Sequence, residues 1–245
     1  MRRLTLTLST PDGPTRRLTV EIQQVLLAGY TGRDRARVAD HVRELAALGV
    51  APPERVPAVY VVEPDLLTIS TEVAVHESRT SGEAEFYLVP TPRGVLVGAA
   101  SDHTDRAHEA VDVEQAKARC PKPISRAVWR YADVRGHWDD LELRSWVSDG
   151  GGRRLYQEGR LEALLPVDDL LAELATAGYS PHHQRIIFGG TLPTAGGLVY
   201  GHRFEVELYD PVLGRRLGCA YDVVQASDPQ SGPATLPPAA DAPPS

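Results

Sequence analysis

Cysteine is scarce in this sequence, and its scarcity excludes two common ways of stabilising a small protein. Only Cys120 and Cys219 occur among 245 residues, and neither belongs to a Cys-x-x-Cys pair. A disulfide framework and a thiolate zinc site both need more cysteines at closer spacing. We therefore expect a reduced, cytoplasmic protein. Its length allows a large core, in which about 70 to 75% of the unfolded surface is buried.

Long apolar runs and an excess of positive charge are also absent. No run approaches the ~20 apolar residues of a membrane-spanning helix, and the start of the chain, MRRLTLTLST, alternates too regularly for a signal peptide. The 26 Lys and Arg are outnumbered by 33 Asp and Glu, which gives a formal net charge of −7. We expect neither a membrane nor a nucleic-acid partner. The Gly-x-Ser-x-Gly motif of common serine hydrolases is missing as well.

Alternation of apolar and polar residues predicts strands along most of the chain. The expected strands are 4–9, 17–25, 67–75, 83–89, 94–99, 141–147 and 203–208. Helical spacing predicts two helices, 35–48 and 167–177, the first with Asp34 as N-cap and Gly49 as its stop. These elements favour a β-rich α+β fold in one domain over 1–225. Residues 226–245, with six prolines, are predicted to form a disordered tail.

Glu83 and Glu85 stand two residues apart at the start of an apolar run. Side chains alternate along a strand, so both would point to the same side, roughly 7 Å apart. Such a pair needs a cation, a metal or a shared proton unless it faces water. Asp102 follows the next predicted strand, and a hairpin would return it to the pair. Three carboxylates suit Mg²⁺, Mn²⁺ or Ca²⁺; the alternative is a solvated strand face.

Further candidates are weaker by themselves. His41 and Glu44 share a helix face, where the carboxylate could orient the imidazole as a general base, although an ordinary polar helix surface gives the same pattern. Lys117 or Lys122 could stabilise a developing oxyanion. The turn Gly189-Gly190-Thr191 could present backbone N–H groups to a carboxylate.

In their order along the chain, these motifs resemble the fumarylacetoacetate hydrolase superfamily and, within it, the DUF2848 branch. Glu83 and Glu85 match its ExE metal pair, and Asp102 falls in the segment similar to NDxTAR. Lys117 matches the lysine before a Cys-Pro. The other matching segments, from about Gly29 to Val224, are 32–34 for GRN, 41–44 for HVxE, 156–159 for RQxG and 190–196 for GTPxGVG.

The resemblance implies a mixed β-roll or β-sandwich with a short N-terminal lid helix, in a homodimer. It implies an enzyme that uses Mg²⁺ or Mn²⁺ to hydrolyse a carbon–carbon bond in a 1,3-dicarbonyl or acylpyruvate-like 2-oxo acid. The implied metal ligands are Glu83, Glu85 and Asp102. The implied catalytic residues are His41, Glu44 and Lys117, and the implied substrate-binding residues are Arg33, Arg106, Gln157, Gly190 and Thr191.

Two departures from the family pattern concern the substrate. Only 17 positions separate Glu85 from Asp102, so a loop that usually borders the pocket is short or missing. Glu63 stands where acylpyruvate hydrolases carry a lysine. Two alternatives therefore stay open. One is decarboxylation, tautomerisation or hydration of a 2-oxo acid, and the other is a non-catalytic protein that binds a small molecule.

Overall fold

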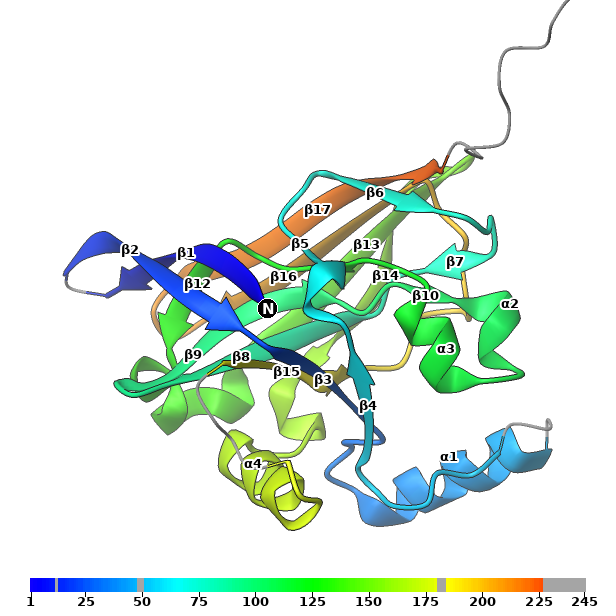
Figure 1. The fold of residues 1–245 in the computed structure, drawn as a ribbon, viewed down its shortest axis with the longest axis horizontal. Helices are drawn as coiled ribbons and strands as arrows, with labels where there is room; N and C mark the ends of the chain where they lie inside the picture. The colour runs from blue at the N-terminus through cyan, green and yellow to red at the C-terminus, as the bar shows by residue number, and fades with distance from the viewer. Residues whose placement is uncertain (12, 48–50, 180–183, 227–245) are drawn as a thin grey trace, which may run out of the picture.

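The computed structural model describes residues 1–11, 13–47, 51–179 and 184–226 (Figure 1). The predicted helix stop at Gly49 and the predicted tail after Ala226 lie outside these ranges. No helix in the described ranges is long and apolar enough to cross a membrane.

Within the described residues, eight strands form the larger sheet, in the order β2-β1-β12-β9-β8-β15-β3-β4. The sheet is mixed, because β1 pairs with β12 and β15 with β3 in parallel, whereas β8 and β9 form an antiparallel hairpin. The strands are β1 (Arg2–Thr10), β2 (Gly13–Ile22), β3 (Gln24–Gly29), β4 (Ala58–Val62), β8 (Ala84–Thr91), β9 (Gly94–Ser101), β12 (Ala127–Arg130) and β15 (Arg185–Thr191).

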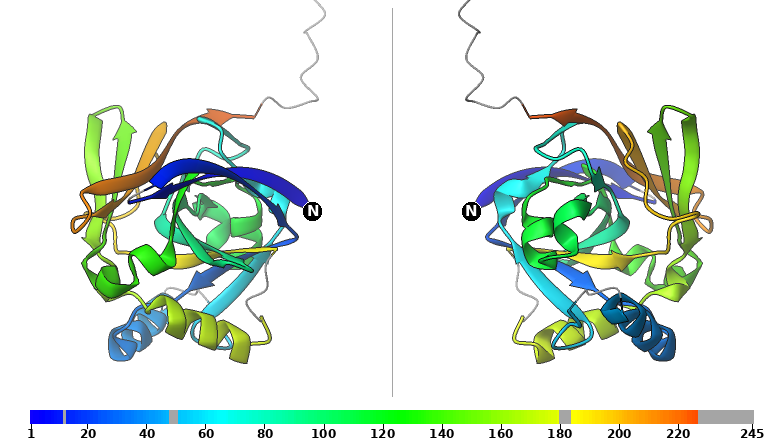
Figure 2. Two further views of the ribbon diagram at one scale, coloured as in Figure 1. Left: turned by 90° about the vertical axis from the view of Figure 1, so that its left-hand side faces the viewer. Right: turned by 90° about the vertical axis from the view of Figure 1, so that its right-hand side faces the viewer.

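A second sheet of five described strands has the order β14-β13-β16-β17-β6 and packs against one face of the larger sheet (Figures 1 and 2). Its strands are β6 (Glu72–Val75), β13 (Glu142–Asp149), β14 (Gly152–Arg160), β16 (Arg203–Asp210) and β17 (Arg215–Gln225). Two short pairs join β5 (Leu67–Thr68) to β11 (Lys122–Pro123) and β7 (Thr80–Ser81) to β10 (Thr104–Asp105).

Helices are few in the described ranges, and they lie outside the sheets. The α-helices are α1 (Arg35–Ala47), α2 (Arg106–Glu109), α3 (Val113–Ala118) and α4 (Val167–Thr176). Short segments of 3₁₀ helix are found at Pro64–Leu66, Tyr131–Asp133, Arg135–Asp140 and Leu161–Ala163. In Figure 1, α1 and α4 lie along the lower edge of the molecule, and α2 and α3 lie side by side above α1.

Strand β8 is buried on both faces, and this position explains its nearly continuous apolar sequence. Phe86 and Leu88 pack into the core between the two sheets. Tyr87 and Val89 point the other way, into a second core enclosed by β1, β3 and β9. Each such side chain contributes about 1.5–3 kcal/mol by leaving water. Because Glu85 alternates with Phe86, it shares the face of Tyr87 and lies at the end of this second core.

The β-rich α+β fold predicted from the sequence is confirmed. Helix α1 begins as expected, because Asp34 Oδ1 accepts hydrogen bonds from the N–H groups of Ala36 and Arg37 at 3.0 and 3.2 Å. The predicted strand 17–25 is divided between β2 and β3, and 67–75 between β5 and β6. Alternation did not predict β4, β12, β14, β15 or β17.

Candidate metal centre

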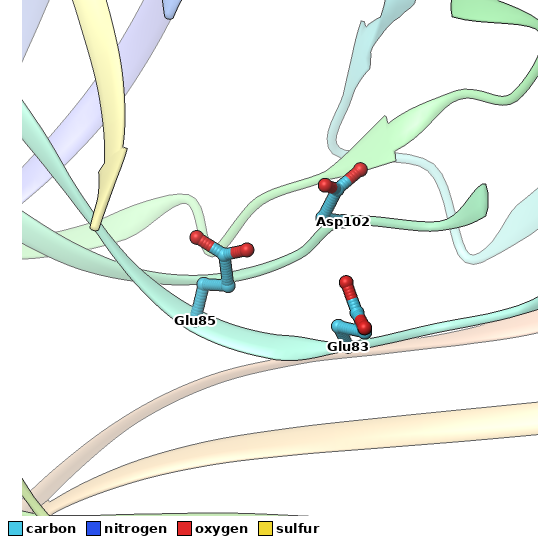
Figure 3. Close-up of side chains that lie close together, drawn as sticks. All are labelled: Glu83, Glu85 and Asp102. Atoms are coloured by element: carbon cyan, nitrogen blue, oxygen red, sulfur yellow. The ribbon is translucent and has the colours of Figure 1, made fainter. Parts of the chain in front are cut away.

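A tight hairpin brings the three predicted carboxylates together. β8 and β9 pair with Ala84 opposite Ser101, so Glu83 and Asp102 lie just beyond the paired ends. The Asp102 N–H donates to the Glu83 carbonyl at 2.9 Å. One carboxylate oxygen each from Glu83, Glu85 and Asp102 lies within 4.8 Å of the others, and the three side chains converge (Figure 3). The expected hairpin therefore builds a cluster of carboxylates.

The cluster is buried, which makes its negative charge costly. Glu85 is 3% exposed and Asp102 0%, whereas the Glu83 side chain keeps 20% of its exposure. Burial, followed by repulsion from Asp102, raises the pKa of Glu85 well above its usual range. Glu85 is therefore not part of a solvated strand face. The cluster requires positive charge beside it.

Two lysines supply positive charge to Asp102 from opposite sides. The ammonium of Lys117, on α3, donates a short hydrogen bond to Asp102 Oδ2 and lies 3.7 Å from Glu83 Oε2. Lys122, in β11, is fully buried; its Nζ lies 2.8 Å from Asp102 Oδ1 and donates to the His103 carbonyl at 2.6 Å. Burial alone would raise the pKa of Asp102, but the two ammonium groups hold it well below its usual range.

Arg106 provides a third cation, at the start of α2. Its Nε donates to Ser81 Oγ at 2.7 Å, and its NH1 donates to Glu109 Oε2 at 2.8 Å. Its NH2 lies 3.2 Å from Glu83 Oε1 in an ion pair but forms no hydrogen bond within the described residues. Arg106, the predicted substrate contact, is thus paired with the carboxylate cluster and keeps one buried donor for a further acceptor.

The cluster fits a hard divalent cation by the chemistry of its donors. Three anionic oxygens that converge within 4.8 Å suit Mg²⁺ or Mn²⁺, and three protein ligands leave positions for water or substrate. The raised pKa of Glu85 has the same implication, because an ion among the carboxylates would remove the repulsion that burial creates. Glu83, Glu85 and Asp102 are the residues that would hold the ion.

Gly190 reaches the cluster through its backbone. Its N–H donates to Glu85 Oε2 at 2.7 Å. The residue has φ +97°, and a Cβ at this position would lie 1.8 Å from Thr31 Oγ1. The neighbouring Gly189 is equally crowded, because its Cβ would lie 2.0 Å from Phe86 Cζ. The glycines predicted to form a turn lie instead in strand β15, at a shift of register between Phe188 and Thr191 in its pairing with β8. They are part of the site, where glycine allows the close backbone approach.

Gln157 and Thr191 lie behind the carboxylates rather than among them. Gln157 Oε1 accepts from the Ala84 N–H at 2.8 Å and from Ser145 Oγ at 3.0 Å. Its Nε2 donates to Thr191 Oγ1 at 2.8 Å and to the Leu192 carbonyl at 2.5 Å. Protein groups thus occupy the donors and acceptors of this buried amide. Since Ala84 separates the two glutamates, Gln157 helps to fix their positions.

The predicted base is not brought to the cluster. The His41 side chain, on α1, is 60% exposed, and its Nδ1 lies 3.8 Å from Glu44 Oε2. Its ring centroid is 6.2 Å from that of Tyr30. Within the described residues, no contact joins His41 to the three carboxylates. The His41–Glu44 pair exists as expected, but α1 holds it outside the site.

Arg33 faces away from the carboxylates as well. Its guanidinium forms two hydrogen bonds with Asp139, at 2.8 and 2.6 Å, and its Nε donates to the Leu164 carbonyl at 3.1 Å. Arg33 and Arg35 line a cleft of about 730 Å³ against α4. Arg33 was predicted to bind substrate. In this arrangement it instead attaches the segment before α1 to Asp139 and Leu164.

Three residues beside the site were not among the site residues that the resemblance implied, although Lys122 was a candidate by itself. Tyr60 in β4 places its ring 5.7 Å from Lys117 Nζ, and burial raises its pKa to about 12. Tyr30 is a non-glycine residue with φ +58°, and burial raises its pKa too. Lys122 had a sequence signal, since it directly follows the Cys-Pro of the family pattern. The two tyrosines had none: β4, which carries Tyr60, was not predicted, and Tyr30 lies directly after β3.

The same arrangement of sheets occurs in solved structures of other proteins. A candidate fumarylacetoacetate isomerase/hydrolase from Oleispira antarctica is similar with a TM-score of 0.62 and 15% identity, over 89% of this chain and 99% of that one. For a candidate fumarylacetoacetate hydrolase family protein from Yersinia pestis CO92, the TM-score is 0.59 at 16% identity, over 84% and 94%. For 2-keto-3-deoxy-D-arabinonate dehydratase in its apo form, it is 0.60 at 15% identity, over 88% and 78%.

These likenesses define the fold as that of the fumarylacetoacetate hydrolase proteins. Within that class the sequence is more specific: the model of the DUF2848 family, described as a protein of unknown function, matches residues 28–221. The chain belongs to the DUF2848 family, as its motifs indicated. No curated protein matches the chain in sequence.

Proposed function

We propose that this protein is a divalent-metal-dependent hydrolase that cleaves a carbon–carbon bond in a 1,3-dicarbonyl or acylpyruvate-like 2-oxo acid. The observation that carries the proposal is the buried convergence of Glu83, Glu85 and Asp102 within 4.8 Å. Such a cluster is a poor structural element, because its two buried carboxylates, Glu85 and Asp102, lose their hydration. It is a good site for Mg²⁺ or Mn²⁺, and the likeness to proteins named for fumarylacetoacetate hydrolase supports this choice.

In the proposed chemistry, the carboxylate site and Lys117 stabilise the enolate, whereas His41, Glu44 and Arg33 contribute from α1 and the segment before it. A bound Mg²⁺ or Mn²⁺ would polarise the oxygens of a 2-oxo acid and favour its enolate. His41, oriented by Glu44, takes a proton from the water that attacks the carbonyl. The Lys117 ammonium stabilises charge on the departing enolate oxygen, and Arg33 binds the substrate carboxylate. Because α1 holds His41 outside the site, and Asp139 and the Leu164 carbonyl hold Arg33 there, hydrolysis requires α1 and the segment before it to move toward the site.

The other predicted substrate-binding residues act close to the carboxylates in this proposal. Arg106 stays paired with Glu83 through NH2, and this group, which forms no hydrogen bond within the described residues, offers a donor to the substrate. Gly190 and Thr191 border the site, and Gln157 acts by holding the ligand strand in place. We propose that residues 1–225 form one catalytic domain that works as a homodimer in the cytoplasm.

A second candidate is decarboxylation, tautomerisation or hydration of a 2-oxo acid. The exposed position of His41 favours it, because these reactions need enolate stabilisation but no water attacking a carbonyl. One protein of similar fold is named as a dehydratase. One fold can host several reactions, so the choice between hydrolysis and this second candidate requires identification of the reaction products.

The test of the metal requirement is a calorimetric titration with oxalate, a mimic of the pyruvate enolate, with and without Mg²⁺. We expect binding only with the ion, and loss of binding in Glu83→Ala. Oxalate binding that is the same without Mg²⁺ and in Glu83→Ala would contradict the proposal. The absence of binding both with and without Mg²⁺ would contradict it as well. Product analysis with acylpyruvates and with oxaloacetate then separates hydrolysis from the second candidate.

A further inference from the structure

The Lys117 ammonium lies among the carboxylates that would hold the metal. It donates a short hydrogen bond to Asp102 Oδ2, and its Nζ is 3.7 Å from Glu83 Oε2. The side chain is only 9% exposed, so this is not a mobile surface lysine. In the described structure the Lys117 ammonium therefore contacts two of the three carboxylates, those of Asp102 and Glu83.

The helix that carries Lys117 is fixed at both ends. Asp112 caps α3, because its Oδ1 accepts from the Gln115 N–H at 2.9 Å. Arg119, directly after the helix, pairs with Asp105 at 3.1 Å. These contacts fix the position of α3, so the fold determines where the Lys117 side chain enters the site.

A divalent ion and this ammonium compete for the same oxygens. Mg²⁺ lies about 2.0–2.1 Å from its ligand oxygens, so carboxylate oxygens up to 4.8 Å apart have to draw closer together to hold it. The hydrogen bond from Lys117 to Asp102 Oδ2 occupies a carboxylate oxygen of the cluster, and the two positive charges repel each other. Tyr60 offers the ammonium a second contact, since its ring centroid lies 5.7 Å from Nζ.

Lys122 differs from Lys117 in its approach. It contacts the other oxygen of Asp102, Oδ1, at 2.8 Å, and it is also held by the His103 carbonyl at 2.6 Å. The Lys122 ammonium thus contacts a different Asp102 oxygen from Lys117, and in the described residues it forms no ion pair with Glu83, unlike Lys117. Of the two lysines, Lys117 is the one whose contacts conflict with an ion.

We propose that Lys117 is a built-in counter-cation of the carboxylate cluster, which competes with the divalent ion for Asp102 and Glu83 and so sets the affinity of the site for metal. The inference rests on the proposed metal-dependent function. It adds that the metal-free state is neutralised from within the chain, and that metal binding displaces the Lys117 ammonium from Asp102.

The experiment is a calorimetric titration of MnCl₂, and separately MgCl₂, into chelator-treated full-length protein. Lys117→Met removes the charge and keeps an unbranched side chain of similar length, whereas Lys117→Arg retains the charge as a matched control. We expect Lys117→Met to bind Mn²⁺ about tenfold or more tightly than the unchanged protein, because no ion pair has to be broken. Lys117→Arg should show no such gain.

Thermal unfolding gives a second readout that does not depend on turnover. Without metal, Lys117→Met should unfold at a lower temperature, because the cluster has lost a counter-charge. Added Mn²⁺ should raise its melting temperature by more than it raises that of the unchanged protein. Lys117→Gln repeats both measurements with a polar replacement, in case the methionine variant does not fold.

The possible results separate this inference from the proposed function. Tighter binding by Lys117→Met, or binding by that variant alone, supports the inference. Equal or weaker binding overturns it, and the metal-dependent function stands if Glu83→Gln still abolishes binding. If neither the unchanged protein nor the lysine variants bind an ion, the inference and the metal requirement both fail.

Discussion

The Gly190 N–H donates to Glu85 Oε2 at 2.7 Å, although the two residues are 105 positions apart in the chain. This hydrogen bond joins the end of β15 to Glu85 on β8, a proposed metal ligand, so it helps to fix the orientation of one carboxylate. The contact depends on a residue without a side chain, because φ is +97° and a Cβ would lie 1.8 Å from Thr31 Oγ1.

Gly190→Ala should therefore damage the site and the fold together. We expect the free energy of unfolding to fall by about 1–3 kcal/mol or more, from backbone strain and the clash with Thr31. Mn²⁺ affinity should fall as well, because Glu85 loses a donor. Urea unfolding and calorimetry measure the two effects. Gly150→Ala is the control, since no atom lies within 4 Å of a Cβ there. If Gly190→Ala matches this control in its free energy of unfolding and in its Mn²⁺ affinity, the hydrogen bond is dispensable.

His41→Ala should separate chemistry from metal binding. His41 contacts no carboxylate of the cluster in the described structure, so the Mn²⁺ dissociation constant should stay unchanged. If His41 is the general base, hydrolysis of an acylpyruvate should fall by about 100-fold or more. Steady-state kinetics and calorimetry on the same sample make the comparison. His76, another exposed histidine, provides the matched alanine control. Full turnover in His41→Ala would remove the residue from the mechanism and favour the second candidate reaction.

The Arg33–Asp139 ion pair should matter more for substrate binding than for stability. The pair is partly exposed, so Asp139→Asn should change the free energy of unfolding by less than ~1 kcal/mol. By releasing Arg33, it should lower KM for a substrate with a carboxylate, whereas Arg33→Met should raise KM. Arg35→Met is the control, because Arg35 forms a comparable surface pair with Glu173 at 2.8 Å. A KM that responds to neither Arg33→Met nor Asp139→Asn would refute the substrate role of Arg33.

Asp210 should give the protein a stability that disappears in acid. Burial alone would raise the pKa of Asp210, but hydrogen bonds from the Leu213 N–H, Arg215 and His137 lower it below its usual range. The folded state thus favours the carboxylate. Its contribution is complete above the unfolded pKa of about 3.9 and is lost as the pH falls through the lower folded pKa.

Asp210→Asn should accordingly cost about 1–3 kcal/mol of unfolding free energy at pH 7. The difference from the unchanged protein should shrink as the pH is lowered toward 3. Urea titrations at a series of pH values follow both quantities, and Asp65→Asn, at an exposed position, serves as the control. A cost that stays constant down to pH 3 would mean that the charge of Asp210 contributes nothing.

The sequence by itself determined the parts of this protein that depend on neighbours in the chain. Glu83 and Glu85 share a face because strands have a period of two, and Asp102 joins them because the next strand returns in a hairpin. Asp34 caps α1 through the N–H groups that follow it. These relationships span few residues, so spacing and residue type are enough to predict them.

The tertiary structure alone decided how the charges of the site are balanced and which groups reach it. Arg33 meets Asp139 across 106 positions, Lys117 approaches Asp102 on a helix that spacing did not predict, and β4 brings Tyr60 beside Lys117. A buried carboxylate can be neutralised by any cation that the packing places within reach, and the sequence contains 26 lysines and arginines. Which of them lies there is set by how the sheets and helices pack, and local patterns do not encode that packing.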